Sequence, residues 1–325
     1  MPNPTPGSVH VDTYLTDVSV AYLQSSTGFV ADRVFPRVPV QKQSGLIATY
    51  NQGDFLRDEV EKRAAGDSAV QIGYRTGSTS YIADEWAAEH AIDDQLRANA
   101  DVPYSPEEDA SRFLTQKMMI KREREWVTNF FSTGNLWTGS SDAADLVSGT
   151  DFTAWSNAAS TPIEDVETRQ RTVQSNTGFL PNKLVLGAQT FTDLKNHPDI
   201  VDRIKYTSSE PVSAQLIARL MGVEEVLITS AVYDTVQEGV TSNPNFIGDD
   251  DALLVYAPPS PSLLTPSGGY TFTWSGLIGS NEGQVIDVRR EDGHVSDVVR
   301  VRAAWAQKRV APGLGVFFNN CSTRV

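Results

Sequence analysis

The amino-acid sequence predicts an α+β fold built from a long β-hairpin, a long helix and a compact α/β lobe. Residues 68–82 contain alternating apolar and polar side chains, which is the period of a half-buried β-strand, and residues 35–50 form a second β-like run. Residues 105–133 carry helix-start signals followed by an apolar stripe of helical period. Residues 180–260 alternate short apolar runs with helical segments, which is typical of an α/β unit with its own core.

The composition fits a globular protein. The chain has 325 residues, 40% of them apolar and 21% charged, which is enough to bury a sizeable core. No run of eighteen apolar residues occurs, so no membrane span is predicted. The N-terminal residues lack the basic and apolar regions of a secretory signal, and the single cysteine, Cys321, excludes an intrachain disulfide. The net charge of −14 argues against a reader of duplex DNA, which must offset phosphates with lysine and arginine.

The first elements predict an arm followed by a hairpin. Residues 1–34 begin with several prolines and read as an extended arm. Pro36 and Pro39 place the start of the first β-like run at the edge of a sheet or outside any sheet. The two β-like runs are joined by a polar loop, which predicts a long hairpin with an irregular tip. A loop of this length is uncommon unless it has a function or is disordered.

The tip of this hairpin is densely charged, with eight charged residues among the fourteen from Asp54 to Asp67. Acidic and basic side chains are interleaved along it. This interleaving favours a complementary surface for a protein partner over an anion site. The residues expected to make the contact are Arg57, Asp58, Glu59, Glu61, Lys62 and Arg63.

The long helix is expected at about residues 106–132. Ser105 is a suitable N-cap, and the acidic residues that follow favour the positive end of the helix dipole. Phe113, Ile120 and Val127 recur every seven residues, and with Phe131 they predict a narrow buried stripe. At 1.5 Å per residue, such a helix is on the order of 40 Å long and is expected to act as a strut.

A second helix is predicted between Thr161, which forms a capping box with Glu164, and a stop at Gly178. A short buried strand follows at residues 181–187. Beyond it the sequence predicts helices at 188–197 and 213–222 and strands at 224–234 and 251–258. After a Pro-rich segment the chain returns to strands, and the last one alternates Val299, Val301 and Ala303 against Arg300, Arg302 and Ala304.

The sequence offers few candidates for catalysis, and we predict no enzyme activity, no cofactor and no metal. Four histidines lie in separate elements without metal-ligand spacing, and they are expected at surface or turn positions. Asp249–Asp251 lack the spacing of a calcium loop, so a solvated turn is expected. The acidic pairs Asp84/Glu85 and Asp93/Asp94 leave a carbohydrate-active hydrolase open as an alternative. The six tryptophans are expected to be core and interface anchors, although they could instead line a sugar cleft.

This order of parts resembles the major capsid proteins of tailed bacteriophages, which have the HK97-like fold. The resemblance covers nearly the whole chain. It is carried by VFPRVPVQKQSGLIATY, EVEKRAAGDSA, REREWVTNFF, TGFLPNKLVLGAQTFTDLKNHPDI and GQVIDVRREDGHVSDVVRVRAAWAQKRVAPGLGVFFNN. The best single marker is PNKLVLG followed by a short helix and HPDI, which is similar to the start of the capsid axial domain.

The resemblance implies a division of the chain into the parts of that family. Residues 1–34 look like the N-arm, 35–83 like the E-loop, 84–179 like the peripheral (P) domain with its spine helix, 180–270 like the axial (A) domain, and 271–325 like the return to the P domain. In the family the E-loop lies over a neighbouring subunit, which would explain the charged tip. A hairpin too long to bury itself is stable only where its edge and tip meet another subunit.

The resemblance also implies a location and partners. Copies would form hexamers and pentamers that tile an icosahedral shell, assembled in the host cytoplasm and present in the virion. The shell would enclose double-stranded DNA without sequence-specific binding and would contact no membrane. A portal, a decoration protein and a separate scaffolding protein are the expected further partners. Another self-assembling phage structural protein, such as a tail tube, remains an alternative, but tail tubes are mostly β.

Overall fold

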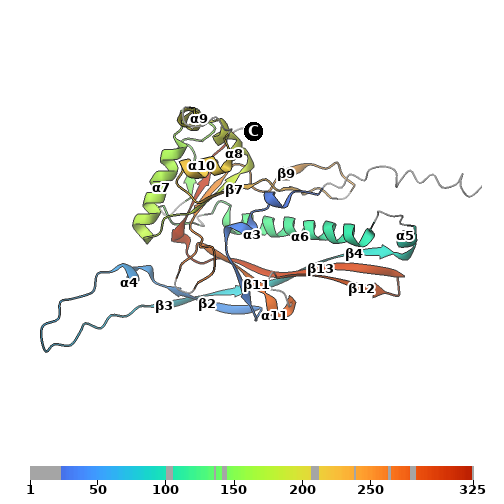
Figure 1. Ribbon diagram of the computed structural model, residues 1–325, viewed down its shortest axis with the longest axis horizontal. Helices are drawn as coiled ribbons and strands as arrows, with labels where there is room; N and C mark the ends of the chain where they lie inside the picture. Colours follow the sequence, from blue (N-terminus) through green and yellow to red (C-terminus); the bar gives the residue numbers. More distant parts are fainter. Residues whose placement is uncertain are drawn as a thin grey trace, which may run out of the picture.

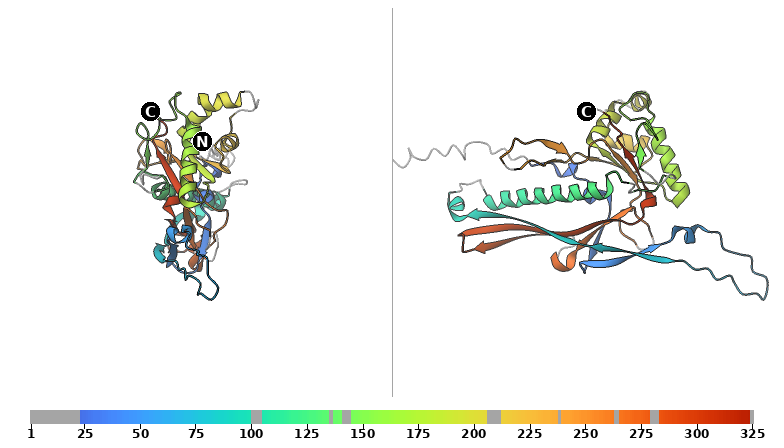
Figure 2. Two further views of the ribbon diagram at one scale, coloured as in Figure 1. Left: turned by 90° about the vertical axis from the view of Figure 1, so that its left-hand side faces the viewer. Right: turned by 180° about the vertical axis from the view of Figure 1, so that it is seen from behind.

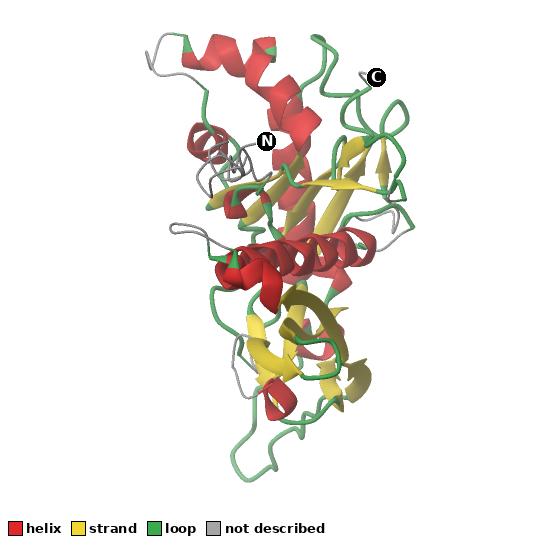
Figure 3. Cartoon of the chain, turned by 90° about the vertical axis from the view of Figure 1, so that its right-hand side faces the viewer, coloured by secondary structure: helices red, strands yellow, loops and turns green. Residues whose placement is uncertain are grey.

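The computed structural model describes residues 23–99, 105–134, 137–140, 145–205, 212–237, 239–262, 265–278 and 283–323. Figure 1 shows a compact α/β lobe, a long sheet with one long helix along it, and a hairpin that projects from the end of that sheet. The end-on view in Figure 3 places the long helix between the lobe and the sheet. The mixed α+β architecture predicted from the sequence is confirmed, whereas the strand at Asp84–Asp93 was not predicted.

The described helices and 3-10 turns are η1 (Ser26–Gly28), α3 (Ala31–Val34), α4 (Gln52–Leu56), α5 (Asp94–Ala98), α6 (Pro106–Phe130), α7 (Pro162–Thr177), α8 (Ala188–Asn196), α9 (Pro198–Ile204), α10 (Ala214–Leu220), α11 (Ser275–Ile278) and η2 (Pro312–Leu314). The described strands are β1 (Arg37–Val40), β2 (Ser44–Tyr50), β3 (Thr76–Ile82), β4 (Asp84–Asp93), β5 (Leu146–Val147), β6 (Lys183–Gly187), β7 (Glu225–Thr229), β8 (Val232–Asp234), β9 (Pro244–Phe246), β10 (Ala252–Val255), β11 (Gly269–Trp274), β12 (Gln284–Glu291), β13 (Ser296–Arg309) and β14 (Gly315–Asn319). No helix in these described ranges is both long and apolar enough to cross a bilayer.

The long helix α6 has 25 residues and begins at Pro106 as predicted, although the Ser105 side chain makes no capping hydrogen bond. The predicted buried stripe is confirmed only at its C-terminal end, because Phe113 is 47% exposed, whereas Val127 packs against a buried cluster and Phe131 is buried. The buried stripe follows every fourth residue, because the helix packs on two layers at once. Its N-terminal half packs on the long sheet, whereas its C-terminal end packs under the lobe. The residues of this stripe are Ala110, Leu114, Met118, Trp126 and Phe130.

The long sheet lies beneath α6. Its strand order is β1-β11-β13-β12, and β4 pairs with the other side of β13. The predicted alternation of the last strand is confirmed: Val299, Val301 and Ala303 are fully buried against the helix, whereas Arg300 and Arg302 lie on the opposite face. Among the described strands, β1 pairs with β11 alone and lies at the edge of this sheet, as Pro39 predicts.

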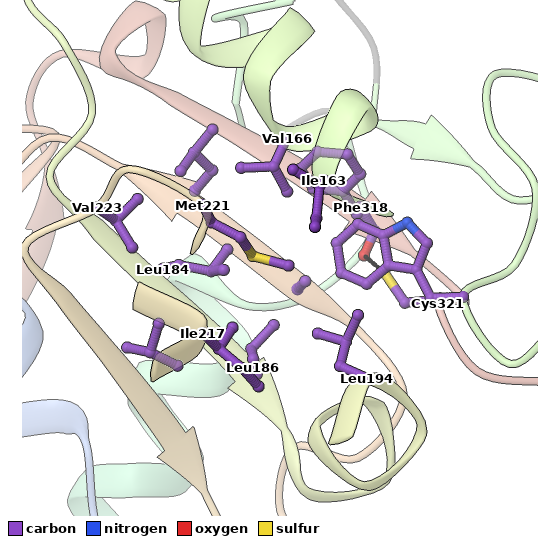
Figure 4. Packing of buried hydrophobic residues seen from close by; sticks show 14 of the residues in the cluster. Ile163, Val166, Leu184, Leu186, Leu194, Ile217, Met221, Val223, Phe318 and Cys321 are labelled. Atoms are coloured by element: carbon purple, nitrogen blue, oxygen red, sulfur yellow. Dashed lines mark hydrogen bonds between the residues drawn. The ribbon is translucent and has the colours of Figure 1, made fainter. Parts of the chain in front are cut away.

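The α/β lobe has a sheet of order β5-β14-β10-β6-β7, in which β6 pairs parallel with β7 and antiparallel with β10. Figure 4 shows its core, where Ile163 and Val166 of α7 meet Leu184 and Leu186 of β6. The lobe therefore also contains residues that lie before and after the expected 180–260 block in the sequence. Helix α7 ends at Gly178 in the left-handed conformation, as predicted, but Thr161 makes no capping hydrogen bond.

The hairpin is shorter than the sequence predicts. Strands β2 and β3 pair antiparallel from Ser44↔Ile82 to Tyr50↔Thr76. Residues 68–75 were predicted as part of the second strand, and this is wrong: they are exposed and belong to no strand. Within the described chain, no neighbouring strand lies alongside them to accept their backbone hydrogen bonds. Both views in Figure 2 show this segment projecting away from the body.

A buried carboxylate on α6 fixes the start of the described chain. Glu123 has no exposed surface, and its two oxygens accept the backbone N–H groups of Val30 (3.0 and 3.1 Å) and Ala31 (2.8 Å). These are orphan donors at the start of α3. Burial, helped by the nearby charge of Asp32, raises the pKa of Glu123 to about 7, although the two N–H groups act in the opposite direction.

This raised pKa predicts a pH dependence of subunit stability. Glu123 binds its proton more tightly in the folded state than at its ordinary pKa of 4.5, so its contribution to the free energy of unfolding is largest below pH 4.5. That contribution falls as the pH rises to about 7, by on the order of 3 kcal/mol in total. Thermal melts of free subunits at pH 5 and pH 8 should therefore show a smaller difference for Glu123→Gln than for the parent.

A matched control for this prediction is Glu61→Gln, because Glu61 is exposed in the hairpin tip. The control should keep the parent's difference between the two pH values. Asp251, whose pKa burial also raises to about 7, is present in all three proteins, so it cancels from the comparison. If Glu123→Gln and the parent gave parallel profiles, Glu123 would not carry this linkage.

Candidate functional site

The six charged residues expected to contact a partner lie together on the projecting hairpin, just beyond α4. All are exposed except Glu59, which is half-buried. The segment from residue 57 to residue 63 contains no helix or strand, so no regular backbone hydrogen bonding fixes the positions of these side chains. The structure therefore presents them to the surroundings, away from both cores of the molecule (Figure 1).

Most of these charges have no ion-pair partner among the residues that the structure describes. Arg57 pairs with Asp54 at 3.2 Å and with Glu59 at 3.4 Å. Over the described ranges, Lys62 and Arg63 have no carboxylate within 4 Å. Cations without internal partners are available to a second molecule at little cost to the subunit. The neutral total charge of residues 57–63 would give such a contact specificity rather than a large net attraction.

The root of the loop is held by a clamp that the sequence did not reveal. The Asp54 carboxylate accepts hydrogen bonds from the backbone N–H of Arg75 (2.9 Å) and from its guanidinium (3.0 and 3.1 Å). Arg75 lowers the pKa of Asp54 to about 2 through these bonds. The backbone N–H of Asn51 also donates to the carbonyl of Arg75 (3.3 Å). The two sides of the loop are thus fixed where the strands end, and the tip projects in a defined direction.

Three exposed aromatic rings lie at the same root. The ring centroids of Tyr50, Phe55 and Tyr74 are 5.7–5.8 Å apart, within the range of favourable aromatic pairs. Phe55 remains 60% exposed and Tyr74 62% exposed. Exposed apolar side chains continue along both sides of the hairpin: Leu46, Leu56, Val60, Val70, Ile72 and Ile82. An apolar surface of this extent on a projecting element is typical of an interaction site.

The acidic pairs considered for a hydrolase do not form a catalytic site. Glu85 pairs with Arg302 at 2.7 Å, and Asp94 pairs with Arg290 at 2.6 Å. Asp93 caps α5 by accepting the N–H of Gln95. Hydrogen bonds from Arg290 lower the pKa of Asp94, whereas a glycosidase acid requires a raised one. Four of the six tryptophans are buried in the cores, namely Trp126, Trp137, Trp155 and Trp305, as expected for core anchors.

One of the four histidines, His197, lies at the turn between α8 and α9, which is one of the two expected kinds of position, but it is not on the surface. His197 is buried, and its Nε2 lies 2.9 Å from Ser160 Oγ. Its Nδ1 accepts the N–H of Asp199 (3.2 Å), so the neutral ring carries its proton on Nε2 and donates it to the Asn157 carbonyl (3.0 Å). A protonated Nε2 cannot take the hydroxyl proton from Ser160. The pair stabilises a loop and does not activate a nucleophile.

The Asp249–Asp251 loop lies directly before β10 and Asp249 is exposed, as expected for a solvated turn, but hydrogen bonds also give the loop a structural role. The Asp249 carbonyl accepts the N–H of Gln189 (3.1 Å) at the start of α8, and the Asp251 carbonyl accepts that of Gly187 (2.9 Å). The Asp251 carboxylate accepts the N–H of Asn320 (2.9 Å), and burial raises its pKa to about 7. The loop therefore joins α8 to the end of β14. Among the described residues, no group of three or more His, Cys, Asp or Glu side chains could hold a metal ion.

Comparison with known proteins gives three findings. The model of the family "Phage major capsid protein E" matches residues 143–266. The major capsid protein of Burkholderia phage BcepMu is 26% identical over 288 residues, covering 87% of this chain and 88% of that protein. Among solved structures, a phage-related protein from Bordetella bronchiseptica RB50 has a TM-score of 0.68 at 22% identity, covering 93% of this chain and 94% of that one.

A chain from the capsid structure of the cyanophage P-SCSP1u is also similar to this one. It has a TM-score of 0.63 at 10% identity, covering 95% of this chain and 92% of that chain. Identities this low show a shared fold only. The described architecture is accordingly the HK97-like capsid fold, in agreement with the expectation from the order of elements.

Proposed function

We infer that this chain is a major capsid protein of a tailed bacteriophage, and that copies of it associate into an icosahedral shell. The observation that carries this conclusion is the likeness to a phage major capsid protein over nearly the full length of both chains. The role is structural and non-enzymatic, and it places the protein in the virion.

The finer division of the chain follows as part of the same proposal. Residues 1–34 form the N-arm, of which the described part is anchored on α6 by Glu123. Residues 35–83 form the E-loop. The P domain comprises residues 84–179 and 271–325, with α6 as its spine helix, and residues 180–270 form the A domain. The lobe sheet includes β5 and β14, so the A domain shares its core with segments of the P domain on either side.

The hairpin tip is the proposed contact between subunits. Arg57, Asp58, Glu59, Glu61, Lys62 and Arg63 set the partner and the register, while the neighbouring exposed apolar side chains supply buried area. Copies form hexamers and pentamers around enclosed double-stranded DNA, and the net charge of −14 suits a shell that must not bind that DNA tightly. A separate scaffolding protein, a portal and a decoration protein are the proposed further partners.

Electron microscopy of the purified protein, expressed with and without candidate scaffolding proteins of the same phage, tests this function. We expect closed particles of uniform diameter. Tubes would indicate a tail component, and a protein that stays monomeric at high concentration under every condition would contradict a shell role. Reproducible hydrolysis of a polysaccharide that is lost on mutation of Glu85 or Asp94 would favour the hydrolase.

A further inference from the structure

The segment from Ser68 to Arg75 has the sequence of a strand but no partner in the subunit. Val70, Ile72 and Tyr74 alternate with Gln71, Gly73 and Arg75, yet Val70 and Ile72 are 51% and 52% exposed. No backbone hydrogen bond is made by the N–H groups of residues 68–74 to any part of the chain that the structure describes. Apolar alternation without a covered face indicates that the covering surface lies outside the subunit.

The root of the hairpin directs this segment outward. Asp54 holds both the backbone and the guanidinium of Arg75, and Tyr74 packs beside Phe55 at 5.7 Å. The last residues of the segment are therefore fixed where β3 begins. An extended chain that starts from a fixed end loses less conformational entropy when it pairs with another strand than a free peptide does.

The long sheet has a free edge at β12, and this edge also carries apolar side chains that are left exposed. Ile286 and Val288 of β12 lie opposite Val301 and Val299 of β13 on the face that packs against α6. Val299 and Val301 are fully buried, whereas Ile286 is 46% exposed and Val288 58% exposed. In the described chain β12 pairs only with β13, so its other edge has unpaired backbone groups. An added strand with apolar side chains on this face would extend the buried surface.

One subunit cannot join these two features by itself. Figure 1 shows the hairpin projecting from one end of the molecule and the β12 turn at the opposite end. Figure 2 shows the same separation from behind. Residues 68–75 of one copy can therefore reach the free edge of β12 only in a second copy. Such a contact joins different surfaces of identical chains, and contacts of this kind close into rings when the rotation permits.

We propose that residues 68–75 form a β-strand on the free edge of β12 in a second copy of this chain. Val70, Ile72 and Tyr74 then cover Ile286 and Val288, while Gln71 and Arg75 face the opposite side of the extended sheet. This proposal rests on the proposed function, because it requires that copies assemble. Beyond the proposed function, it states that residues 68–75 become a strand on assembly and that β12 of the second copy pairs with them.

Cysteine labelling at successive positions tests the proposed strand. Cys321 is the sole native cysteine and is fully buried, so Cys321→Ala gives a clean background. Val70→Cys, Gln71→Cys and Ile72→Cys should react at similar rates with a soluble maleimide in free subunits. In assembled shells, positions 70 and 72 should react at least about tenfold more slowly than position 71, because reaction there requires local opening. Shells in which all three positions react alike would overturn the proposal.

Matched substitutions test the acceptor edge. Val288→Asp places a charge at the proposed junction, whereas Val295→Asp makes the same change at a similarly exposed residue in the turn after β12. The Val288→Asp subunit should melt close to the parent, and the Val295→Asp subunit should melt no lower, because the φ of 50° at Val295 suits aspartate better than valine. Val288→Asp should raise the concentration needed for assembly at least about tenfold, and Val295→Asp should not. Equal assembly of the two variants would exclude this edge. Failure of the parent to assemble would instead contradict the proposed function.

Discussion

Reversal of Lys62 and Arg63 to glutamate is expected to abolish closed shells while leaving the free subunit folded. Both side chains are exposed, and neither has an ion-pair partner in the described chain. Arg57 is left unchanged because it supports Asp54 at the root of the loop. One exposed pair contributes only ~0–1 kcal/mol, but a shell repeats each contact in every copy, so a small repulsion accumulates across cooperative assembly.

Sedimentation of the double variant beside the parent, at low and high salt, measures this effect. Shells should be absent at low salt and partly recovered at high salt, since salt screens the new repulsion. The conservative variant Lys62→Arg with Arg63→Lys keeps both charges and should assemble like the parent. Normal assembly of the reversed variant at every salt concentration would show that the tip does not dock through these charges. An unfolded monomer would show that the tip belongs to the subunit's own core.

Gly187→Ala is expected to prevent folding of the α/β lobe. A Cβ atom at this position would lie 1.9 Å from the carbonyl oxygen of Asp249 and 2.3 Å from its carbonyl carbon. Both atoms are backbone, so they cannot move without breaking the hydrogen bonds that join this loop to α8 and β14. Because the clash involves buried backbone on both sides, the loss should exceed ~3 kcal/mol, at the upper end for overpacking.

Circular dichroism melts and the soluble yield of the variant measure this loss. Gly293→Ala is the matched control, because a Cβ at Gly293 meets nothing within 4 Å. The control should melt like the parent, whereas Gly187→Ala should be insoluble or lack a cooperative transition. A Gly187→Ala subunit that melts within a few degrees of the parent would mean that the close approach of the Asp249 loop is not required for the fold.

Sequence patterns predicted where helices begin and end better than which of their faces are buried or which strands share a sheet. The bounds of α6 and α7 followed from local signals such as Pro106 and Gly178, which act through the backbone of their own helix. The buried face of α6 did not, because it is decided by two different layers that pack on its two halves. The membership of β5 and β14 in the lobe sheet is also a long-range property, which no local pattern records.

The same limit applies to the candidate site. The interleaved charges of the tip were visible in the sequence because they are consecutive. The hydrogen bonds between Asp54 and Arg75 join residues that are 21 positions apart in the sequence. The buried Glu123 cannot be distinguished in the sequence from a glutamate on the exposed face of a helix. Residues 68–75 have alternating apolar side chains, but the strand that this alternation predicts is absent from the subunit. We attribute this difference to a partner surface that a single chain does not contain.

A three-dimensional reconstruction of assembled particles by cryo-electron microscopy tests the central claim most directly. The account predicts a closed icosahedral shell in which the hairpin of each copy lies on a neighbouring copy, with the tip charges at the contact. It also predicts that α6 and the α/β lobe keep the packing seen in the subunit. Particles of another symmetry class, or a closed shell in which residues 51–75 contact only their own subunit, would contradict it.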